Sequence, residues 1–109
     1  MGARYKIIVV PFLQVSGMAL FPFILVNKKS LLNDAVTINH ERIHLRQQAE
    51  LLVIPFYILY LLNYLVNLTI YRNHNNAYLN IVFEREAYAK EADMDYLKRR
   101  KWLGWARYF

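Results

Sequence analysis

Apolar residues gather in two long stretches of this 109-residue chain, residues 7–26 and 51–70. The first stretch contains two β-rich runs, residues 7–10 and 18–26, separated by Gln-Val-Ser-Gly. Short apolar runs that are bounded by turn residues are typical of strands. Because Pro22 lacks a backbone donor, it favours a sheet edge for the second run.

The beginning of the chain also resembles a short signal peptide, because Arg4 and Lys6 precede the first apolar stretch. The β-rich character of the stretch and its internal turn residues favour a pair of strands instead. We therefore expect the protein on the cytoplasmic side of a membrane rather than exported.

The second stretch contains twenty residues without a charge, which is enough for a helix to span a bilayer. Pro55 is expected to break or kink this helix. A polar stripe at helical spacing, typical of a helix packed against protein partners, is formed by Tyr60, Asn63, Tyr64, Asn67 and Tyr71. The pattern leaves a membrane-embedded helix and a buried core helix equally open.

Two further segments are predicted to be helical. Residues 77–101 contain many helix-forming residues and no Gly or Pro. Residues 35–52 have three possible N-terminal caps, namely Asn33, Asp34 and Thr37. Together the patterns predict one α+β domain over residues 1–109, with a short N-terminal β-hairpin or edge strands followed by a bundle of about three helices.

The composition narrows the classes of protein and of site. Hydrophobic residues make up 57% of the chain, above the roughly 45–50% of ordinary soluble domains, and this excludes intrinsic disorder. The sequence has no Cys, which excludes disulfides and thiolate metal sites. A metal ion would have to be bound by His, Asp or Glu.

Positive charge is concentrated at the end of the chain. The net charge is +6, and residues 98–109 contain five cations interspersed with Trp, Tyr and Phe. Cations beside aromatic rings suit an anionic membrane surface, although the same cations could simply complement the dipole of a helix end. We expect no nucleic-acid partner, because no recognition motif accompanies these residues.

The candidate chemistry lies in the run His40-Glu41-Arg42-Ile43-His44, an HExxH motif on a predicted helix. Residues four apart share one helical face, so both imidazoles can bind one zinc ion, and Glu41 beside them can accept a proton from water. The same face carries apolar residues, so both histidines are expected to point inward. Hydrogen-bonded core histidines are the alternative to metal ligands.

A third protein ligand is needed to complete a catalytic zinc site. The metzincin pattern fails, because Glu50 stands where its third histidine would fall. His74 lies in a predicted polar turn, where a histidine is usually solvated. The carboxylates of residues 83–88, Phe-Glu-Arg-Glu-Ala-Tyr, are the better candidates.

Glu84 and Ala87 form a Glu-x-x-Ala arrangement that resembles the ligand position of gluzincin metallopeptidases, in which HExxH on one helix is completed by a Glu on a later helix. Residues 40–101 are also similar to a group of small bacterial proteins, a resemblance that names no substrate. The gluzincin resemblance implies Glu41 as the general base and, as zinc ligands, His40, His44 and Glu84.

The rise of a helix tests the choice of Glu84. At about 1.5 Å per residue, an unbroken helix from His44 to the end of the second apolar stretch would climb about 39 Å, and the chain would return only about 14 Å by Glu84. A sharp reversal near Pro55 would instead bring Glu84 level with His44. A site at Glu84 therefore argues against a single membrane span through residues 51–70. Without the reversal, Glu91 or Asp95 would be better placed than Glu84 to act as the third ligand.

Several neighbours of the motif have structural interpretations. Glu86 is the rival of Glu84, but it lies about 200° away around the helix and is expected to form an exposed pair with Lys90. Tyr88, one turn after Glu84, could support a ligand, but core packing is the favoured expectation. The residues expected to cover the surface of the HExxH helix are Arg42, Arg46, Gln47 and Gln48.

The sequence thus favours a zinc metallopeptidase that acts on a peptide or protein and associates with a membrane through residues 51–70 and 98–109. The substrate would lie along a sheet edge, for which residues 21–26 are the candidate. The alternative is a non-catalytic membrane or scaffold protein in which HExxH is structural or vestigial.

Overall fold

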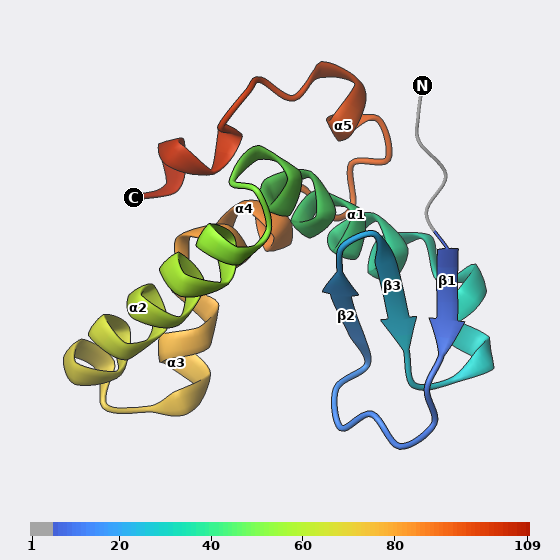
Figure 1. The fold of residues 1–109 in the computed structure, drawn as a ribbon, viewed down its shortest axis with the longest axis horizontal. Helices are drawn as coiled ribbons and strands as arrows, with labels where there is room; N and C mark the ends of the chain where they lie inside the picture. The colour runs from blue at the N-terminus through green and yellow to red at the C-terminus, as the bar shows by residue number, and fades with distance from the viewer. Residues whose placement is uncertain (1–5) are drawn as a thin grey trace.

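The computed structural model describes residues 6–109 and places a small sheet before the helices (Figure 1). Its strands are β1 (Lys6–Val9), β2 (Gly17–Leu20) and β3 (Phe23–Val26). β3 is the central strand, parallel to β1 and antiparallel to β2. The strand interpretation of the first apolar stretch is confirmed, whereas Arg4 lies outside the described residues.

The helical part follows the sheet and completes the α+β fold expected from the sequence. Its helices are the 3₁₀ helix η1 (Lys29–Asn33), α1 (Ala35–Glu50), α2 (Ile54–Tyr71), α3 (His74–Leu79), α4 (Val82–Lys90), α5 (Tyr96–Arg99) and the 3₁₀ helix η2 (Gly104–Tyr108). The Asp34 side chain caps α1 by accepting a hydrogen bond from the Thr37 N–H at 3.1 Å. α1 packs on the sheet through a core that includes Ala19, Ile24, Val26 and Leu45.

The second β-rich run forms two strands rather than one. Phe21 and Pro22 form the turn between β2 and β3, so Pro22 does not lie in an edge strand as predicted. The expected substrate edge at residues 21–26 is also wrong, because β3 pairs on both sides. The edge strand that packs against α1 is β2.

The chain turns sharply between α1 and α2, as a site at Glu84 requires. α1 ends at Glu50, and Leu52 and Val53 in the connection both have a φ of 62°. Pro55 lies in the first turn of α2, where its missing N–H has no intrahelical partner to lose. α2 then leads away from α1 and from the sheet (Figure 1).

The chain returns along α2 through α3 and α4. The contacts are hydrogen bonds from Asn67 to the Ala77 carbonyl (3.1 Å), from the Val82 N–H to Asn63 (2.8 Å) and from Tyr60 to Glu84 (2.6 Å). The polar stripe of α2 therefore faces protein partners, as expected, and the return brings Glu84 back to α1.

The single helix predicted over residues 77–101 is wrong, because side chains from other elements interrupt it. Ile81 is extended, with φ −61° and ψ 131°, and the N–H that follows it bonds to Asn63. α4 ends at Lys90. There the side chain of Asn39 donates to three backbone carbonyl groups in residues 90–93. These contacts replace helical hydrogen bonds with tertiary ones.

The C-terminal residues fold back against α4. The Trp105 ring packs on Phe83, with 5.2 Å between the ring centroids. The Arg100 side chain is buried between Glu50 and Glu86. One of the five cations in residues 98–109 is therefore used inside the protein and does not contribute to the surface of this segment.

Candidate metal centre

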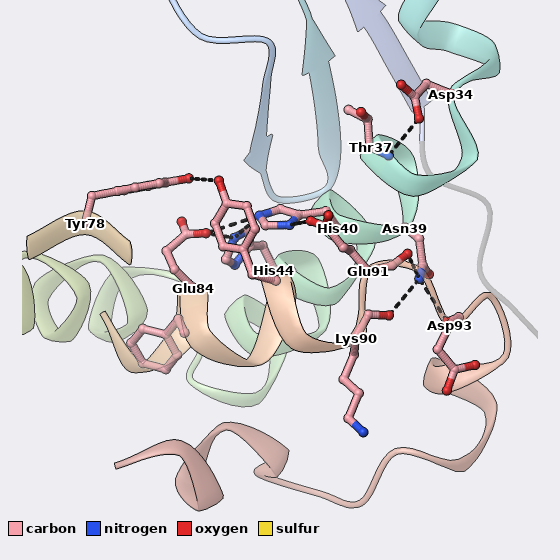
Figure 2. A network of polar contacts seen from close by, with 12 residues as sticks. Asp34, Thr37, Asn39, His40, His44, Tyr78, Glu84, Lys90, Glu91 and Asp93 are labelled. Atoms are coloured by element: carbon pink, nitrogen blue, oxygen red, sulfur yellow. Dashed lines mark hydrogen bonds and ion pairs between the residues drawn. The ribbon is translucent and has the colours of Figure 1, made fainter. Parts of the chain in front are cut away.

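Three potential ligand atoms meet between α1 and α4 (Figure 2). The Nε2 atoms of His40 and His44 lie 3.2 Å apart, and Glu84 Oε1 lies 3.1 Å from the first and 3.0 Å from the second. All three side chains are buried. The three residues lie close enough to bind one metal ion.

The other nitrogen of each imidazole already has a partner. His40 Nδ1 lies 2.7 Å from Glu91 Oε1, and His44 Nδ1 lies 2.8 Å from Gln47 Oε1. Both partners are acceptors, so each Nδ1 carries the proton and donates it. In the neutral imidazoles the two Nε2 atoms then carry lone pairs that converge with an oxygen of Glu84. A cation is the group that such an arrangement stabilises.

Gln47 is held in one orientation by residues of α4. Its amide nitrogen donates to the Phe83 carbonyl at 3.0 Å and to the Glu86 carboxylate at 2.9 Å. The amide oxygen is therefore the atom that faces His44. Glu86 in turn accepts hydrogen bonds from Arg100. This buried chain of contacts fixes both the tautomer and the ring orientation of His44.

The charges in the cluster keep Glu84 ionised. Burial alone would raise the pKa of Glu84, but the positive charge of His44 and hydrogen bonds from His44 and Tyr60 outweigh it and lower this pKa well below its usual range. Burial alone would lower the pKa of His44, but the negative charge of Glu84 raises it to about 9. Without a metal the cluster thus holds a proton that a bound cation would displace.

The spacing of the ligand atoms fits a tetrahedral ion. Two ligand atoms at the usual metal distance of about 2.0–2.1 Å are about 3.3 Å apart in a tetrahedral site, close to the separations observed here. Tyr60 donates to Glu84 Oε2 at 2.6 Å, which leaves Oε1 for the ion. Three protein ligands would leave a fourth position for water or substrate.

Glu41 lies beside the ligand cluster on the wall of a cavity of about 320 Å³. The same cavity is lined by Gly17, His40, Tyr78 and Tyr88. Burial raises the pKa of Glu41, although the charges of His44 and His40 oppose the shift. A buried carboxyl group of raised pKa beside two imidazoles is a candidate for proton transfer.

β2 runs past the cluster and borders two cavities. Gly17 lines the cavity that contains Glu41, and Ala19 lines a second cavity of about 170 Å³ that contains His44. A Cβ atom at position 17 would lie 3.1 Å from Glu41 Oε2. The missing side chain of Gly17 therefore lets the Glu41 carboxylate lie against the edge strand.

The other candidate ligands do not join the cluster. Glu91 bonds to His40 Nδ1, the ring nitrogen that does not face the cluster, and so supports a candidate ligand rather than being one. Asp95 is exposed and pairs with a neighbouring exposed lysine. His74 is exposed and bonds to Tyr64 at 2.9 Å.

Some side chains around the cluster lie deeper than the sequence predicts. Glu86 does not form the predicted exposed pair with Lys90, because it is fully buried and bonds to Arg100. Gln47 and Gln48 are buried too and do not cover the surface of α1. Both amides bond to neighbouring elements, the first to α4 and the second to β2.

Tyr88 is not the core residue that the sequence predicts. Its side chain is 44% exposed, and its ring centroid lies 4.5 Å from that of His40. Its hydroxyl group bonds to that of Tyr78 at 3.1 Å, and Figure 2 shows Tyr78 directed at the cluster from α3. The two tyrosines place hydroxyl groups at the cavity that Glu41 lines.

Sequence reasoning misses the residues that orient the ligands. Gln47 lies three residues after His44 on the same helical face, so its position was a usable signal. Asn39 and Arg100 bond to residues 52 and 50 positions away in the chain, and no local pattern predicts such contacts. Helical periodicity indicates candidate ligands but not their distant partners.

Comparison of the chain with protein-family models, with curated proteins and with solved structures finds no match. The function is therefore inferred from the donor atoms, the cavities and the neighbouring strand.

Proposed function

We propose that this protein is a zinc-dependent metallopeptidase, that is, a hydrolase of peptide bonds. The observation that carries the proposal is the convergence of two imidazole lone pairs and one carboxylate oxygen beside the cavity that Glu41 lines. Metal-assisted hydrolysis requires this combination of three ligands, one open position and an adjacent base. The gluzincin resemblance of the sequence supports the same activity.

Zinc suits these ligands better than other common metals. Two imidazole nitrogens and one carboxylate oxygen at tetrahedral spacing are typical of catalytic zinc, whereas magnesium and calcium prefer oxygen ligands. Zinc-bound histidines usually donate their other N–H to a carboxylate or a carbonyl oxygen. Glu91 and Gln47 supply such acceptors for His40 and His44.

Bound zinc would supply a Lewis acid that polarises a peptide carbonyl and acidifies water. Glu41 accepts the proton of the attacking water and passes it to the leaving nitrogen. The raised pKa of Glu41 makes its protonated form accessible during that transfer. The hydroxyl groups of Tyr78 and Tyr88 can donate to the carbonyl oxygen as negative charge develops on it.

The outer edge of β2 around Gly17 supports an extended peptide as the substrate, whereas side chains of α1 and α2 already occupy this edge at Ala19 and Phe21. The Ala19 carbonyl accepts hydrogen bonds from Gln48 and Tyr57, so it points away from β3. Because backbone directions alternate along an antiparallel strand, the N–H of Ala19 and both backbone groups of Gly17 point the same way. A peptide paired with Gly17 would pass the cavity that Glu41 lines.

The proposal is tested by incubating zinc-loaded protein with peptides from a digested proteome and identifying new termini by mass spectrometry. We expect cleavage that a chelator stops and that added zinc restores. A variant with His40→Ala and His44→Ala, purified in the same way, controls for contaminating peptidases. Zinc-loaded protein that yields no new termini would contradict the proposal.

Gly17→Ala is expected to lower the cleavage rate by about 10–100-fold, because small misplacements of a catalytic group have effects of this size. The added Cβ would lie 3.1 Å from Glu41 Oε2 and 3.4 Å from Glu41 Cγ, so the carboxylate has to move. The rate is measured on a peptide found in the library experiment. Ser16→Ala changes the preceding residue of the same cavity and should leave the rate unchanged. Equal rates for the two variants would show that Glu41 does not act from this position.

Glu91→Ala is expected to weaken zinc binding by about 10–100-fold, the usual effect of removing the partner of a ligating histidine. Glu91 holds the Nδ1 proton of His40 and with it the lone pair on Nε2. Competition with a chromogenic chelator measures the affinity. Asp95→Ala removes an exposed carboxylate from the same region and serves as the control. If the two variants bind zinc equally well, His40 is not a ligand oriented by Glu91.

A further inference from the structure

α2 turns its polar face toward the protein and its apolar face outward, the opposite of a helix on the surface of a soluble protein. Its polar stripe bonds to α3 and α4 through Tyr60, Asn63 and Asn67. Only two of its 18 residues, Phe56 and Asn67, are buried. A helix in water normally turns its apolar face inward and its polar face outward.

The face of α2 opposite the polar stripe is apolar and open. We call it the apolar face, and its residues are Ile54, Ile58, Leu61, Leu62, Leu65, Val66 and Ile70, which are 45–69% exposed. Within residues 6–109 the C-terminal segment borders Leu62 and Val66, and the seven side chains remain about half exposed or more. The helix has a mean hydropathy of 1.4, which is that of a segment able to enter a membrane.

The apolar face continues into a groove next to the C-terminal residues. The groove has a volume of about 400 Å³ and lies between Leu62 and Val66 of α2 on one side and Trp105 and Phe109 on the other. Phe109 is 82% exposed. The same C-terminal segment carries the exposed cations Lys101 and Arg107. An apolar surface that borders aromatic rings, in a chain segment that also carries exposed cations, is typical of elements at a membrane interface.

We propose that the apolar face rests on an anionic lipid bilayer, with α2 lying along the surface. α2 and α3 form a hairpin, the polar stripe of α2 bonds to α3 and α4, and α3 exposes His74, Asn75 and Asn76 to solvent. The hairpin is therefore apolar on one side and polar on the other, as an interfacial element must be. A crossing is disfavoured because the chain returns along α2 after the polar turn at residues 72–76.

The net positive charge of the chain favours an anionic lipid surface over a second copy of the chain as the partner of the apolar face. Two copies that met through the apolar face would each carry a net charge of +6 and repel each other. Anionic headgroups would instead attract the chain, and the exposed cations Lys101 and Arg107 belong to the C-terminal segment whose Trp105 and Phe109 line the groove. The proposal is independent of the activity of the metal site.

The test is flotation of the full-length chain, synthesised in a cell-free system, with vesicles of phosphatidylcholine and phosphatidylglycerol or of phosphatidylcholine alone. The variant combines Ile58→Gln, Leu61→Gln and Leu65→Gln on the apolar face. The control combines three exposed apolar residues outside α2, namely Val15→Gln, Leu32→Gln and Met94→Gln. Far-UV circular dichroism verifies that each chain is folded.

The parent chain and the control are expected to float with the anionic vesicles, and the apolar-face variant to bind them about ten-fold or more weakly. A parent chain that stays unbound, or a variant that floats as well as the control, would overturn the proposal. Equal binding to both kinds of vesicle would overturn the assignment of an anionic surface. A dimer in sedimentation that the variant abolishes, without flotation of the parent, would assign the face to contact between copies instead.

Discussion

Replacement of Glu41 by glutamine is expected to lower peptide cleavage by about 10²–10⁴-fold, the usual contribution of general acid–base catalysis. Glutamine has nearly the same shape as glutamate but cannot accept the proton of the attacking water. Zinc content should not change, because the candidate ligands are His40, His44 and Glu84. The expected result is a correctly folded, zinc-loaded and inactive protein.

The measurement pairs the cleavage rate of the E41Q variant with its zinc content. Asp95→Asn makes the same chemical change at an exposed carboxylate and should leave both quantities unaltered. If E41Q loses its zinc together with its activity, Glu41 supports the metal rather than the reaction. If E41Q retains full activity, the proposed mechanism is wrong. If neither E41Q nor the parent protein cleaves any peptide, a structural role for HExxH gains support.

Replacement of Arg100 by alanine is expected to lower the free energy of unfolding by about 3–5 kcal/mol, as removal of one partner from a buried ion pair does. Arg100 bonds to both Glu50 and Glu86, and all three side chains are 1% exposed or less. Without the guanidinium group two buried carboxylates lose their counter-charge. The loss is a large share of the roughly 5–15 kcal/mol that stabilises a typical domain.

Urea unfolding followed by circular dichroism measures this loss. Arg99→Ala is the matched control, since Arg99 is the neighbouring residue and forms an exposed pair with Asp93. An exposed pair contributes about 0–1 kcal/mol, so the control should unfold almost like the parent. If Arg100→Ala is no less stable than Arg99→Ala, the Glu50–Arg100–Glu86 cluster does not hold the C-terminal segment in place.

Helical periodicity placed His40 and His44 on one face, and the gluzincin resemblance together with the apolar side of the later helix favoured Glu84 as the third candidate ligand. His40 and His44 share a face because they are four residues apart, and Glu84 faces them because it lies near the apolar side of its own helix. The turn near Pro55 followed from the rise per residue on the condition that Glu84 lies level with His44. These features depend on local geometry, which the sequence encodes directly.

The interruptions of the third predicted helix depend on distant side chains. Ile81 leaves the helix where Asn63 bonds to the following N–H, and α4 ends where Asn39 takes up three carbonyl groups. Neither interruption is marked by Gly or Pro. Propensity therefore predicted a continuous helix, and tertiary hydrogen bonds overrode it.

The burial of Glu86 has the same kind of cause. Glu86 lies four residues before Lys90, a spacing typical of an ion pair on a helix surface. In the structure Glu86 bonds instead to Arg100 of the C-terminal segment. The cations of residues 98–109 likewise divide into one buried residue and others that remain exposed. Charge patterns along a chain do not show which charges fold inward.

Elemental analysis of the full-length chain, purified from cells without chelators and without added metal, decides whether the three residues hold zinc. We expect about one zinc ion per chain, the stoichiometry of a three-ligand catalytic site. The same preparation of the variant with His40→Ala and His44→Ala should contain almost none. A parent chain that contains no more zinc than this variant would contradict the assignment of His40, His44 and Glu84 as a zinc site.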